Sequence, residues 1–364
     1  MRIIISAGGT GGHIYPALSI IEGFKKYDKS LEVLYIGTKN RMEKDIVPKE
    51  NIPYYGIEIY GLTKNILRDI KDVFLIVKAK KEVKKLIEEF KPDVILGVGG
   101  YVTYPVLMAA RAKHIKTFIH EQNAIPGKTN KMISKYADII GVSFPETRKY
   151  FPNKNVIYTG NPTGIRALTT PIISKTSLGL KESLPLVVVV CGSLGSATVN
   201  KIMTGYLNTL ENAKYQIVYI TGKALYPEFT KTKYPKNVLV LPYLDNLSGL
   251  LKSADILVAR AGASTIAEIK ALNIPSILIP SPYVANNHQY FNAKALVDND
   301  EAIMLEEENL STDNIKKTIE NLLNDKEKYQ RIKNNLSKVN TLDSTKIIYE
   351  AVKELIKKWI KSVN

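Results

Sequence analysis

A cluster of glycines near the start of the chain, Gly8-Gly9-Thr10-Gly11-Gly12-His13, has residue types and spacing suited to binding a phosphate. It follows the apolar run at residues 3–5 and precedes an amphipathic stretch opened by Pro16, so it is expected to turn a buried strand into a helix. The first N–H groups of a helix have no partner within it and attract anions. The spacing matches neither the dinucleotide-binding pattern nor the P-loop. It predicts a phosphate-binding loop, with a plain tight turn as the alternative.

Two further clusters of polar residues follow predicted strands. His120-Glu121-Gln122-Asn123 ends the strand expected at 117–120, and Ser264 and Thr265 begin a helix after the small residues 261–263. Open α/β sheets bind ligands at the carboxyl ends of their strands. The second cluster would hold a pyrophosphate, while Glu268 would accept hydrogen bonds from the vicinal hydroxyls of a sugar. Helix capping is the alternative for both clusters.

The string Asp298-Asn299-Asp300 has a spacing that would suit a divalent metal bound to a nucleotide diphosphate. It lies, however, in a turn after the helix expected at 290–296. We therefore expect no metal site in the chain. No cofactor is expected to be required, and a divalent cation would at most stimulate activity.

The elements that must position these residues alternate between strands and helices. Strands are expected at residues 2–6, 31–36, 94–96 and 117–120, and a second glycine loop at 97–101. After a linker at 163–185, the apolar run 186–190 and the glycine loop 192–196 repeat the opening theme. Lysine-rich amphipathic helices are expected at 313–335 and 344–361. The pattern predicts an α/β fold of two Rossmann-like domains facing a cleft, 1–162 and 186–343, with a C-terminal helix at 344–364.

Length and composition limit the class of protein. The 364 residues suffice for two domains of about 150 residues each, with 45% hydrophobic and 24% charged residues, as in soluble globular proteins. No secretion signal opens the sequence, and the lone Cys191 cannot form an internal disulfide, which favours the cytosol. The net charge of +16 predicts an anionic partner. Nucleic acid is not expected, because the lysines are spread over helix faces instead of clustering with aromatic residues.

Residues 57–85 contain an apolar stripe bordered by lysines and arginines. Its members recur at helical spacing and are Leu62, Ile66, Leu67, Ile70, Val73, Phe74 and Val77. Such a stripe usually packs a helix onto a sheet. Alternatively, it forms an interfacial surface that inserts apolar side chains among anionic lipid head groups. The sequence leaves both interpretations open.

Six motifs, in order from residue 5 to about residue 295, resemble the MurG family of peptidoglycan N-acetylglucosaminyltransferases. They are residues 8–13, 97–101, 120–123 and 160–162, residues 260–265 with Glu268, and His288-Gln289. The resemblance implies the B-type glycosyltransferase fold, with the C-terminal helix returning to the first domain. It implies inverting transfer of N-acetylglucosamine (GlcNAc) from UDP-GlcNAc to the 4-hydroxyl of N-acetylmuramic acid (MurNAc) in lipid I, undecaprenyl-pyrophosphoryl-MurNAc-pentapeptide, giving lipid II. Such a protein would be peripheral, on an anionic membrane surface at the cytoplasmic face of the cell membrane.

The resemblance also implies roles for individual residues. The second domain would hold the donor: the diphosphate by Ser193, the uracil region by Leu244, the phosphates by Ala263, Ser264 and Thr265, the ribose by Glu268, and the GlcNAc hydroxyls by Gln289. The first domain would close over the sugar and the acceptor with Thr10, Gly11, Gly12 and Asn123. His13 would be the base or a sugar-positioning group.

The sequence departs from the family pattern in two places. The family usually reads Asn-Pro-Val-Arg, but here residues 163–165 separate Pro162 from Arg166, so whether Arg166 binds substrate in its place stays open. The glycine loop of the second domain reads Cys-Gly-Ser-Leu-Gly-Ser at 191–196, and the loss of the usual Gln amide would weaken contacts to the diphosphate. The alternatives are a glycosyltransferase acting on another membrane lipid and a non-catalytic nucleotide- or lipid-binding protein.

Overall fold

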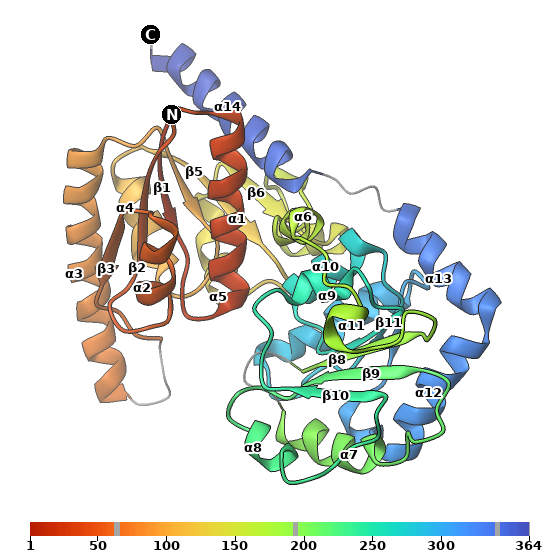
Figure 1. Cartoon of the computed structure of the whole chain (residues 1–364). Helices are drawn as coiled ribbons and strands as arrows, with labels where there is room; N and C mark the ends of the chain where they lie inside the picture. Colours follow the sequence, from red (N-terminus) through yellow and green to blue (C-terminus); the bar gives the residue numbers. More distant parts are fainter. Residues whose placement is uncertain (62–65, 192–195, 339–342, 364) are drawn as a thin grey trace. The chain divides into compact units, whose positions relative to one another are not determined.

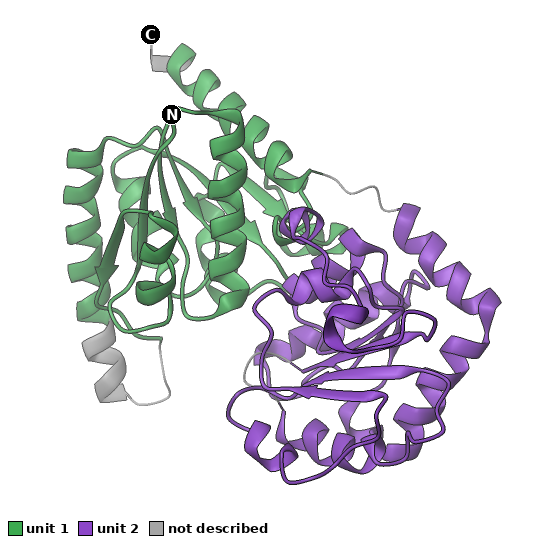
Figure 2. Ribbon diagram, in the orientation of Figure 1, with its two compact units in different colours: residues 1–163, 342–364 green, residues 164–341 purple. Residues whose placement is uncertain are grey.

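The computed structural model of the chain (Figure 1) describes residues 1–61, 66–191, 196–338 and 343–363, and their side chains except those of 66–72 and 362–363. The chain divides into two compact units (Figure 2). Unit 1 comprises residues 1–163 and 342–364, and unit 2 comprises residues 164–341. Each unit is built on one parallel sheet flanked by helices. The predicted fold class, two Rossmann-like α/β domains, is confirmed.

The sheet of unit 1 reverses its strand order at one point. Its strands lie in the order β3-β2-β1-β4-β5-β6-β7. Their bounds are β1 (Arg2–Ser6), β2 (Glu32–Thr38), β3 (Tyr54–Ile57), β4 (Val94–Gly97), β5 (Lys116–Glu121), β6 (Ile139–Val142) and β7 (Val156–Tyr158). The chain builds outward from β1 to β3 and then crosses to the other side of β1 with β4. Sheets of this kind bind ligands at the carboxyl ends of the two strands that flank the reversal, here β1 and β4.

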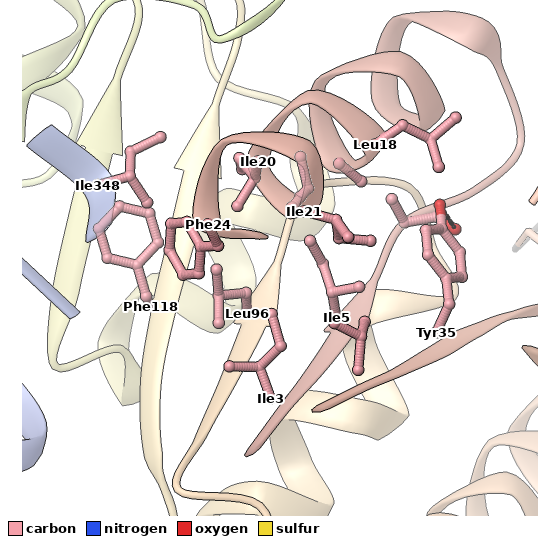
Figure 3. Close-up of a cluster of buried hydrophobic side chains, with 14 of the residues drawn as sticks. Ile3, Ile5, Leu18, Ile20, Ile21, Phe24, Tyr35, Leu96, Phe118 and Ile348 are labelled. Carbon is pink, nitrogen blue, oxygen red and sulfur yellow. Dashed lines mark hydrogen bonds between the residues drawn. The ribbon is translucent and has the colours of Figure 1, made fainter. Parts of the chain in front are cut away.

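Helices cover both faces of this sheet. They are α1 (Gly11–Tyr27), α2 (Glu43–Ile46), α3 (Ile66–Phe90), α4 (Thr103–Ala112), α5 (Lys128–Ile133) and α14 (Ser344–Val363), with short 3-10 turns at η1 (Pro48–Glu50), η2 (Ser134–Tyr136) and η3 (Pro145–Tyr150). Successive side chains of a strand point to opposite faces. Ile3 and Ile5 therefore share a core with Phe24 of α1 (Figure 3), whereas Ile4 joins the opposite core with Val83 of α3. This double burial explains why the three central residues of the opening strand are all isoleucine.

The C-terminal helix α14 belongs to unit 1. The ring of Tyr349 packs edge-on against Phe24, with the ring centroids 5.3 Å apart. Ile348 lies in the same core (Figure 3), and the Tyr27 hydroxyl donates to the Asp343 carboxylate at 2.5 Å. Helix α14 therefore completes the core on the α1 face of the first sheet.

The sheet of unit 2 reverses its strand order in the same way. Its order is β10-β9-β8-β11-β12-β13, from β8 (Leu186–Val190), β9 (Gln216–Ile220), β10 (Val238–Leu241), β11 (Ile256–Ala259), β12 (Ser276–Leu278) and β13 (Ile303–Met304). Its helices are α6 (Thr163–Thr169), α7 (Ala197–Leu207), α8 (Tyr226–Phe229), α9 (Leu247–Leu251), α10 (Ala263–Leu272), α11 (His288–Val297), α12 (Thr312–Asn324) and α13 (Lys326–Lys338), with 3-10 turns at η4 (Thr176–Leu178), η5 (Ala285–Asn287) and η6 (Glu307–Asn309). The reversal lies between β8 and β11, so their carboxyl ends are the expected binding edge.

Two segments differ from the expectations drawn from the sequence. Residues 163–185, expected as a linker, contain α6 and η4 and are fastened to unit 2, where the Lys252 ammonium donates to the carbonyls of Leu168 and Thr170 at 2.7 and 2.6 Å. The helix expected at 313–335 is two helices. Asp325 ends α12, and its carboxylate accepts the N–H of Lys328 at the start of α13. The cap at Asp325 thus divides a segment that hydrophobic periodicity alone predicts as one continuous helix.

Helix α3 has two apolar faces. One is buried in unit 1 and consists of Leu75, Ala79, Val83 and Ile87. The other is open to solvent, with exposed fractions of 55%, 68% and 62% for Val73, Phe74 and Val77. The core interpretation of the stripe is therefore wrong for these three residues, because the sheet-facing side of the helix is the other one. The side chains of Leu62, Ile66, Leu67 and Ile70 lie outside the described residues. No helix in the described part of the chain is long and apolar enough to span a bilayer.

Candidate functional site

The two glycine loops of unit 1 interlock at the carboxyl ends of β1 and β4. The Gly8 N–H donates to the Gly99 carbonyl at 3.2 Å, and the Val98 N–H donates to the Ser6 carbonyl at 2.8 Å. Gly100 has a φ of +86°, and a Cβ there would lie 2.3 Å from the Gly8 carbonyl oxygen. Only glycine fits this close approach. Residues 8–12 and 97–101 therefore form one rigid corner.

Thr10, Gly11, Gly12 and His13 line the open side of this corner. Helix α1 begins at Gly11, and Thr10 and Gly12 are exposed, so the N-terminus of a long helix faces solvent at the binding edge of the sheet. The first N–H groups of a helix carry the positive end of its dipole. The structure thus brings together three of the residues predicted for the sugar and the acceptor, Thr10, Gly11 and Gly12, with the predicted base His13, at a place suited to an anion.

His13 is oriented by its own loop. Its Nδ1 atom lies 3.2 Å from the Gly8 carbonyl oxygen and 3.4 Å from the Thr10 hydroxyl. A carbonyl only accepts hydrogen bonds, so Nδ1 carries the proton and Nε2 is the basic nitrogen of the neutral ring. The ring lies against Gly99, where a Cβ would be 2.4 Å from the His13 Cδ2 atom. The His13 ring is therefore held with its Nδ1 toward its own loop, and its role as a base stays a prediction.

Most of the polar cluster at the carboxyl end of β5 is turned inward and holds the neighbouring loops. His120 is fully buried; its Nε2 lies 3.0 Å from the Gly160 carbonyl, and its Nδ1 accepts from the Gln122 amide at 3.0 Å. Burial lowers the pKa of His120 to about 4, although the Gly160 carbonyl opposes the shift. The Glu121 carboxylate is also buried and accepts the Asn123 N–H at 2.9 Å, besides the Gly127 N–H and the Asn130 amide. Of this cluster, only Asn123 is half-exposed, as a ligand contact requires.

In unit 2, Arg260 fastens the loops at the ends of β8 and β11. Its guanidinium donates to the Ser196 hydroxyl at 2.7 Å and to the Ile279 carbonyl at 3.1 Å, and it pairs with the Glu307 carboxylate at 2.5 Å. Ser196 in turn caps α7. Arg260 thus fixes Ser196, the residue that precedes α7. The sequence analysis missed this role, because Glu307 lies far along the chain in a short 3-10 turn.

The N-terminus of α10 has an unpaired polar group. Helix α10 begins at Ala263 after Gly262, and among the described residues the Ser264 hydroxyl is buried without a hydrogen-bond partner. A buried polar group left unpaired costs about 1–3 kcal/mol. Thr265 follows in the first turn. The arrangement suits an anion, whose oxygen would complete the hydrogen bonding of Ser264.

Glu268 lies farther along α10 and is held by a serine from α9. The Ser248 hydroxyl donates to Glu268 Oε1 at 2.7 Å. Burial raises the pKa of Glu268, and the hydrogen bond from Ser248 opposes the shift. Ser248 leaves Oε2 to accept a hydrogen bond from a ligand hydroxyl. The sequence analysis missed Ser248, which lies in a separate short helix.

Gln289 is the second residue of α11, and its amide is oriented. Its Oε1 atom accepts the Ser281 N–H at 2.9 Å, so Nε2 is directed as a donor, which suits a sugar hydroxyl. Helix α11 is tied to the loop before α10 by Asn292, whose side-chain amide donates to the Ala261 carbonyl at 3.2 Å. The structure thus joins the elements that carry Gln289 and Ser264.

Three other predicted residues of unit 2 are less closely defined. Leu244 is half-buried in the loop between β10 and α9. Arg166 is exposed on α6, which packs on α10 at Gly164, where a Cβ would lie 3.0 Å from the Ala267 carbonyl oxygen. The substrate contact of the Arg166 side chain stays a prediction. Ser193 lies outside the described residues.

The acidic string at residues 298–300 is engaged in ion pairs. Asp298 pairs with Lys294 at 2.7 Å, and Asp300 pairs with Arg331. No group of three or more His, Cys, Asp or Glu side chains suited to a metal ion occurs within the residues the structure describes. Each acidic residue of the string thus has a cation of its own as a partner.

Comparisons with known proteins agree with the two-domain fold. Family models described as the glycosyltransferase family 28 N-terminal and C-terminal domains match residues 3–142 and 186–351. The chain is 41% identical over 361 residues, 98% of its length and 99% of the relative's, to a Bacillus licheniformis protein. A Halalkalibacterium halodurans protein is 44% identical, with 89% and 91% of the two chains covered. Both are named UDP-N-acetylglucosamine–N-acetylmuramyl-(pentapeptide) pyrophosphoryl-undecaprenol N-acetylglucosamine transferase.

A solved structure shows the same likeness. The crystal structure of Acinetobacter baumannii MurG is 26% identical, with a TM-score of 0.78 and coverage of 97% of this chain and 99% of that one. Both family-28 domains are therefore present, and the likeness runs over nearly the whole chain. The chain belongs to the MurG family of glycosyltransferase family 28 enzymes.

Proposed function

We propose that the chain is an inverting hexosyltransferase that moves GlcNAc from UDP-GlcNAc to the 4-hydroxyl of MurNAc in lipid I, giving lipid II for peptidoglycan synthesis. The observation that carries the proposal is identity above 40% to two transferases of that name over most of the chain. The polar residues at the binding edge of each unit support it independently.

In this proposal, unit 2 binds the donor. The N-terminus of α10 and the unpaired Ser264 hydroxyl receive the diphosphate, with Ala263, Thr265 and Ser193 beside it. Glu268 Oε2 accepts from a ribose hydroxyl, because Ser248 already occupies Oε1. The Gln289 amide donates to a GlcNAc hydroxyl. Leu244 contacts the uracil and Arg166 contributes a cation near α10. The site needs no cofactor, because helix N-termini supply the positive charge, and a divalent cation would be at most stimulatory.

Unit 1 receives the acceptor sugar at Thr10, Gly11, Gly12 and Asn123. His13 Nε2 removes the proton of the MurNAc 4-hydroxyl as its oxygen forms the new bond to the GlcNAc anomeric carbon. The bond from that carbon to the UDP oxygen breaks on the opposite face, so the α-linked donor gives a β product. Nδ1 keeps its proton on the Gly8 carbonyl, which holds the ring in the tautomer that a base requires.

We further propose that helix α3 rests on the cytoplasmic face of the cell membrane, which makes the protein peripheral. The lipid chain of the acceptor is buried in a bilayer, so the enzyme has to reach the head groups. The exposed side chains of Val73, Phe74 and Val77 would enter the interface, with Lys78 and Lys81 exposed beside them. Each basic residue near an anionic surface contributes about 1 kcal/mol. The net charge of +16 favours the same partner.

The decisive experiment incubates the purified protein with UDP-GlcNAc and a soluble lipid I analogue and analyses the product. We expect a β-(1→4)-linked disaccharide, and His13→Gln is expected to lower kcat about 10²- to 10⁴-fold. Transfer to diacylglycerol but not to the lipid I analogue would refute the acceptor. Binding of UDP without transfer to either would identify a non-catalytic nucleotide-binding protein.

A further inference from the structure

A buried carboxylate in unit 1 touches the first glycine loop from behind. Glu43, the first residue of α2, is fully buried. Its Oε1 atom accepts the Thr38 N–H at 3.0 Å and the Thr38 hydroxyl at 2.6 Å, both at the end of β2. Its Oε2 atom accepts the Gly9 N–H at 3.2 Å. Glu43 therefore joins the end of β2 to the loop after β1.

The surrounding backbone leaves room for this carboxylate. A Cβ on Gly8 would lie 2.4 Å from Glu43 Oε1, and a Cβ on Gly37 would lie 2.7 Å from Glu43 Cγ. Both positions are glycines, so the side chain fits between the loop and β2. The Tyr54 hydroxyl donates to the Thr38 carbonyl at 2.5 Å and closes the slot from β3. Any larger side chain at Gly8 or Gly37 would displace the carboxylate.

A carboxylate is a costly way to hold two segments together. Removing a charge from water costs several kcal/mol, and well-packed apolar side chains often give equal or greater stability. What an apolar side chain cannot do is accept the N–H of Gly9. Gly9 has a φ of +89° and directly precedes Thr10, where the turn into α1 begins. Glu43 thus acts on the conformation of the residues that present His13.

We propose that Glu43 is a positioning residue for the transfer reaction. It fixes Gly9, and with it the Gly8 carbonyl that holds His13 Nδ1 and the first N–H groups of α1. This inference rests on the proposed function, because it assumes that residues 10–13 meet the acceptor. It predicts that Glu43 acts on the transfer step and leaves donor binding in unit 2 unchanged.

The variant Glu43→Gln tests this, because it keeps the size of the side chain. Two donors from Thr38 face one atom, so the amide oxygen takes that side and the NH₂ group faces the Gly9 N–H. In the variant the side-chain NH₂ group and the Gly9 N–H are both donors, so the hydrogen bond to the glycine loop is lost while those from Thr38 remain. A misplacement of about 1 Å in a reacting group costs about 100-fold in rate. We expect kcat with the lipid I analogue to fall about 10- to 100-fold, with the UDP dissociation constant changed less than about twofold.

Thr38→Val is the matched control. It removes the 2.6 Å hydrogen bond from the same carboxylate and leaves the Gly9 contact in place. We expect it to lower the melting temperature but to keep kcat near that of the wild type. A merely structural role for Glu43 predicts that both variants lose stability and neither loses kcat. Wild-type kcat in folded Glu43→Gln would therefore overturn the inference.

A second variant covers the case in which Glu43→Gln does not fold. Glu43→Asp keeps the charge but is shorter by one carbon–carbon bond, about 1.5 Å, so it cannot reach Thr38 and Gly9 together. Reduced kcat with unchanged UDP affinity again supports the inference, and wild-type kcat overturns it. If neither variant folds, the carboxylate serves folding, and the inference is wrong. Absence of transfer by the wild-type protein would instead refute the proposed function.

Discussion

The buried His120 makes the stability of unit 1 sensitive to acid. The folded protein holds this imidazole fully buried, with Nε2 on the Gly160 carbonyl and Nδ1 accepting from Gln122. Burial lowers its pKa to about 4, compared with about 6.5 for an exposed histidine. At a pH between these two values, His120 is protonated in the unfolded chain but neutral in the folded chain. Unfolding therefore becomes more favourable as the pH falls through this window.

The size of the effect follows from the two pKa values. Above about pH 6.5 both states are neutral and His120 contributes nothing to the pH dependence. Below that pH the free energy of unfolding falls by up to about 1.4 kcal/mol per pH unit, until the folded state protonates near pH 4. Lowering the pH from 7 to 5 should therefore cost about 2 kcal/mol, and the whole window about 3 kcal/mol.

The chain provides its own probe for this measurement. Its single tryptophan, Trp359, lies in α14 of unit 1, so its fluorescence in a urea titration reports on the unit that contains His120. His120→Gln is the comparison, since it cannot titrate and other acid-sensitive groups act equally in both proteins. The wild type should lose about 2 kcal/mol more than the variant between pH 7 and pH 5. Equal losses would refute the reasoning.

The remaining predictions concern the donor, the metal and the membrane. Glu268→Ala should raise the KM for UDP-GlcNAc at least about tenfold, and an unchanged KM would remove Glu268 from the site. Ser248→Ala removes the hydrogen bond that lowers the pKa of Glu268, so the acid-side rise of that KM should move to higher pH. EDTA should leave most activity; complete loss restored by magnesium would show a required metal. The double variant Phe74→Ser and Val77→Ser should sediment less with anionic vesicles at unchanged UDP affinity, and unchanged sedimentation would refute the membrane role of this face.

The sequence predicted the corners of the fold well because their causes are local. An apolar run, a glycine cluster and an amphipathic stretch each consist of consecutive residues. Together they predict a connection from a strand to a helix, and two such connections in each unit indicate the binding edge of its sheet. Gly100 illustrates why the glycines are informative, since a Cβ there would meet the Gly8 carbonyl oxygen at 2.3 Å. The predicted loop at residues 8–13 therefore lies at the strand-order reversal of the first sheet.

Predictions failed or stayed open where the outcome depends on distant partners. The apolar residues of α3 repeat with helical spacing, but periodicity does not say which face a sheet covers, and Phe74 faces solvent. His120 stands at a strand end where ligands bind, yet it turns inward because Gly160 and Gln122 complete its hydrogen bonds. The role of Glu43 was missed, because its partners Gly9 and Thr38 belong to other segments of the chain.

The number of hydrogen-bond partners that a buried polar group has distinguishes residues that support the site from residues that would contact a ligand. Glu121 and Arg260 are buried with several partners each, so their hydrogen bonds hold loops in place. The buried Ser264 hydroxyl, in contrast, has no partner among the described residues, although an unpaired polar group costs stability. A ligand oxygen would remove that cost. Substituting Glu121 should therefore destabilise unit 1, whereas Ser264→Ala should weaken donor binding at little cost in stability.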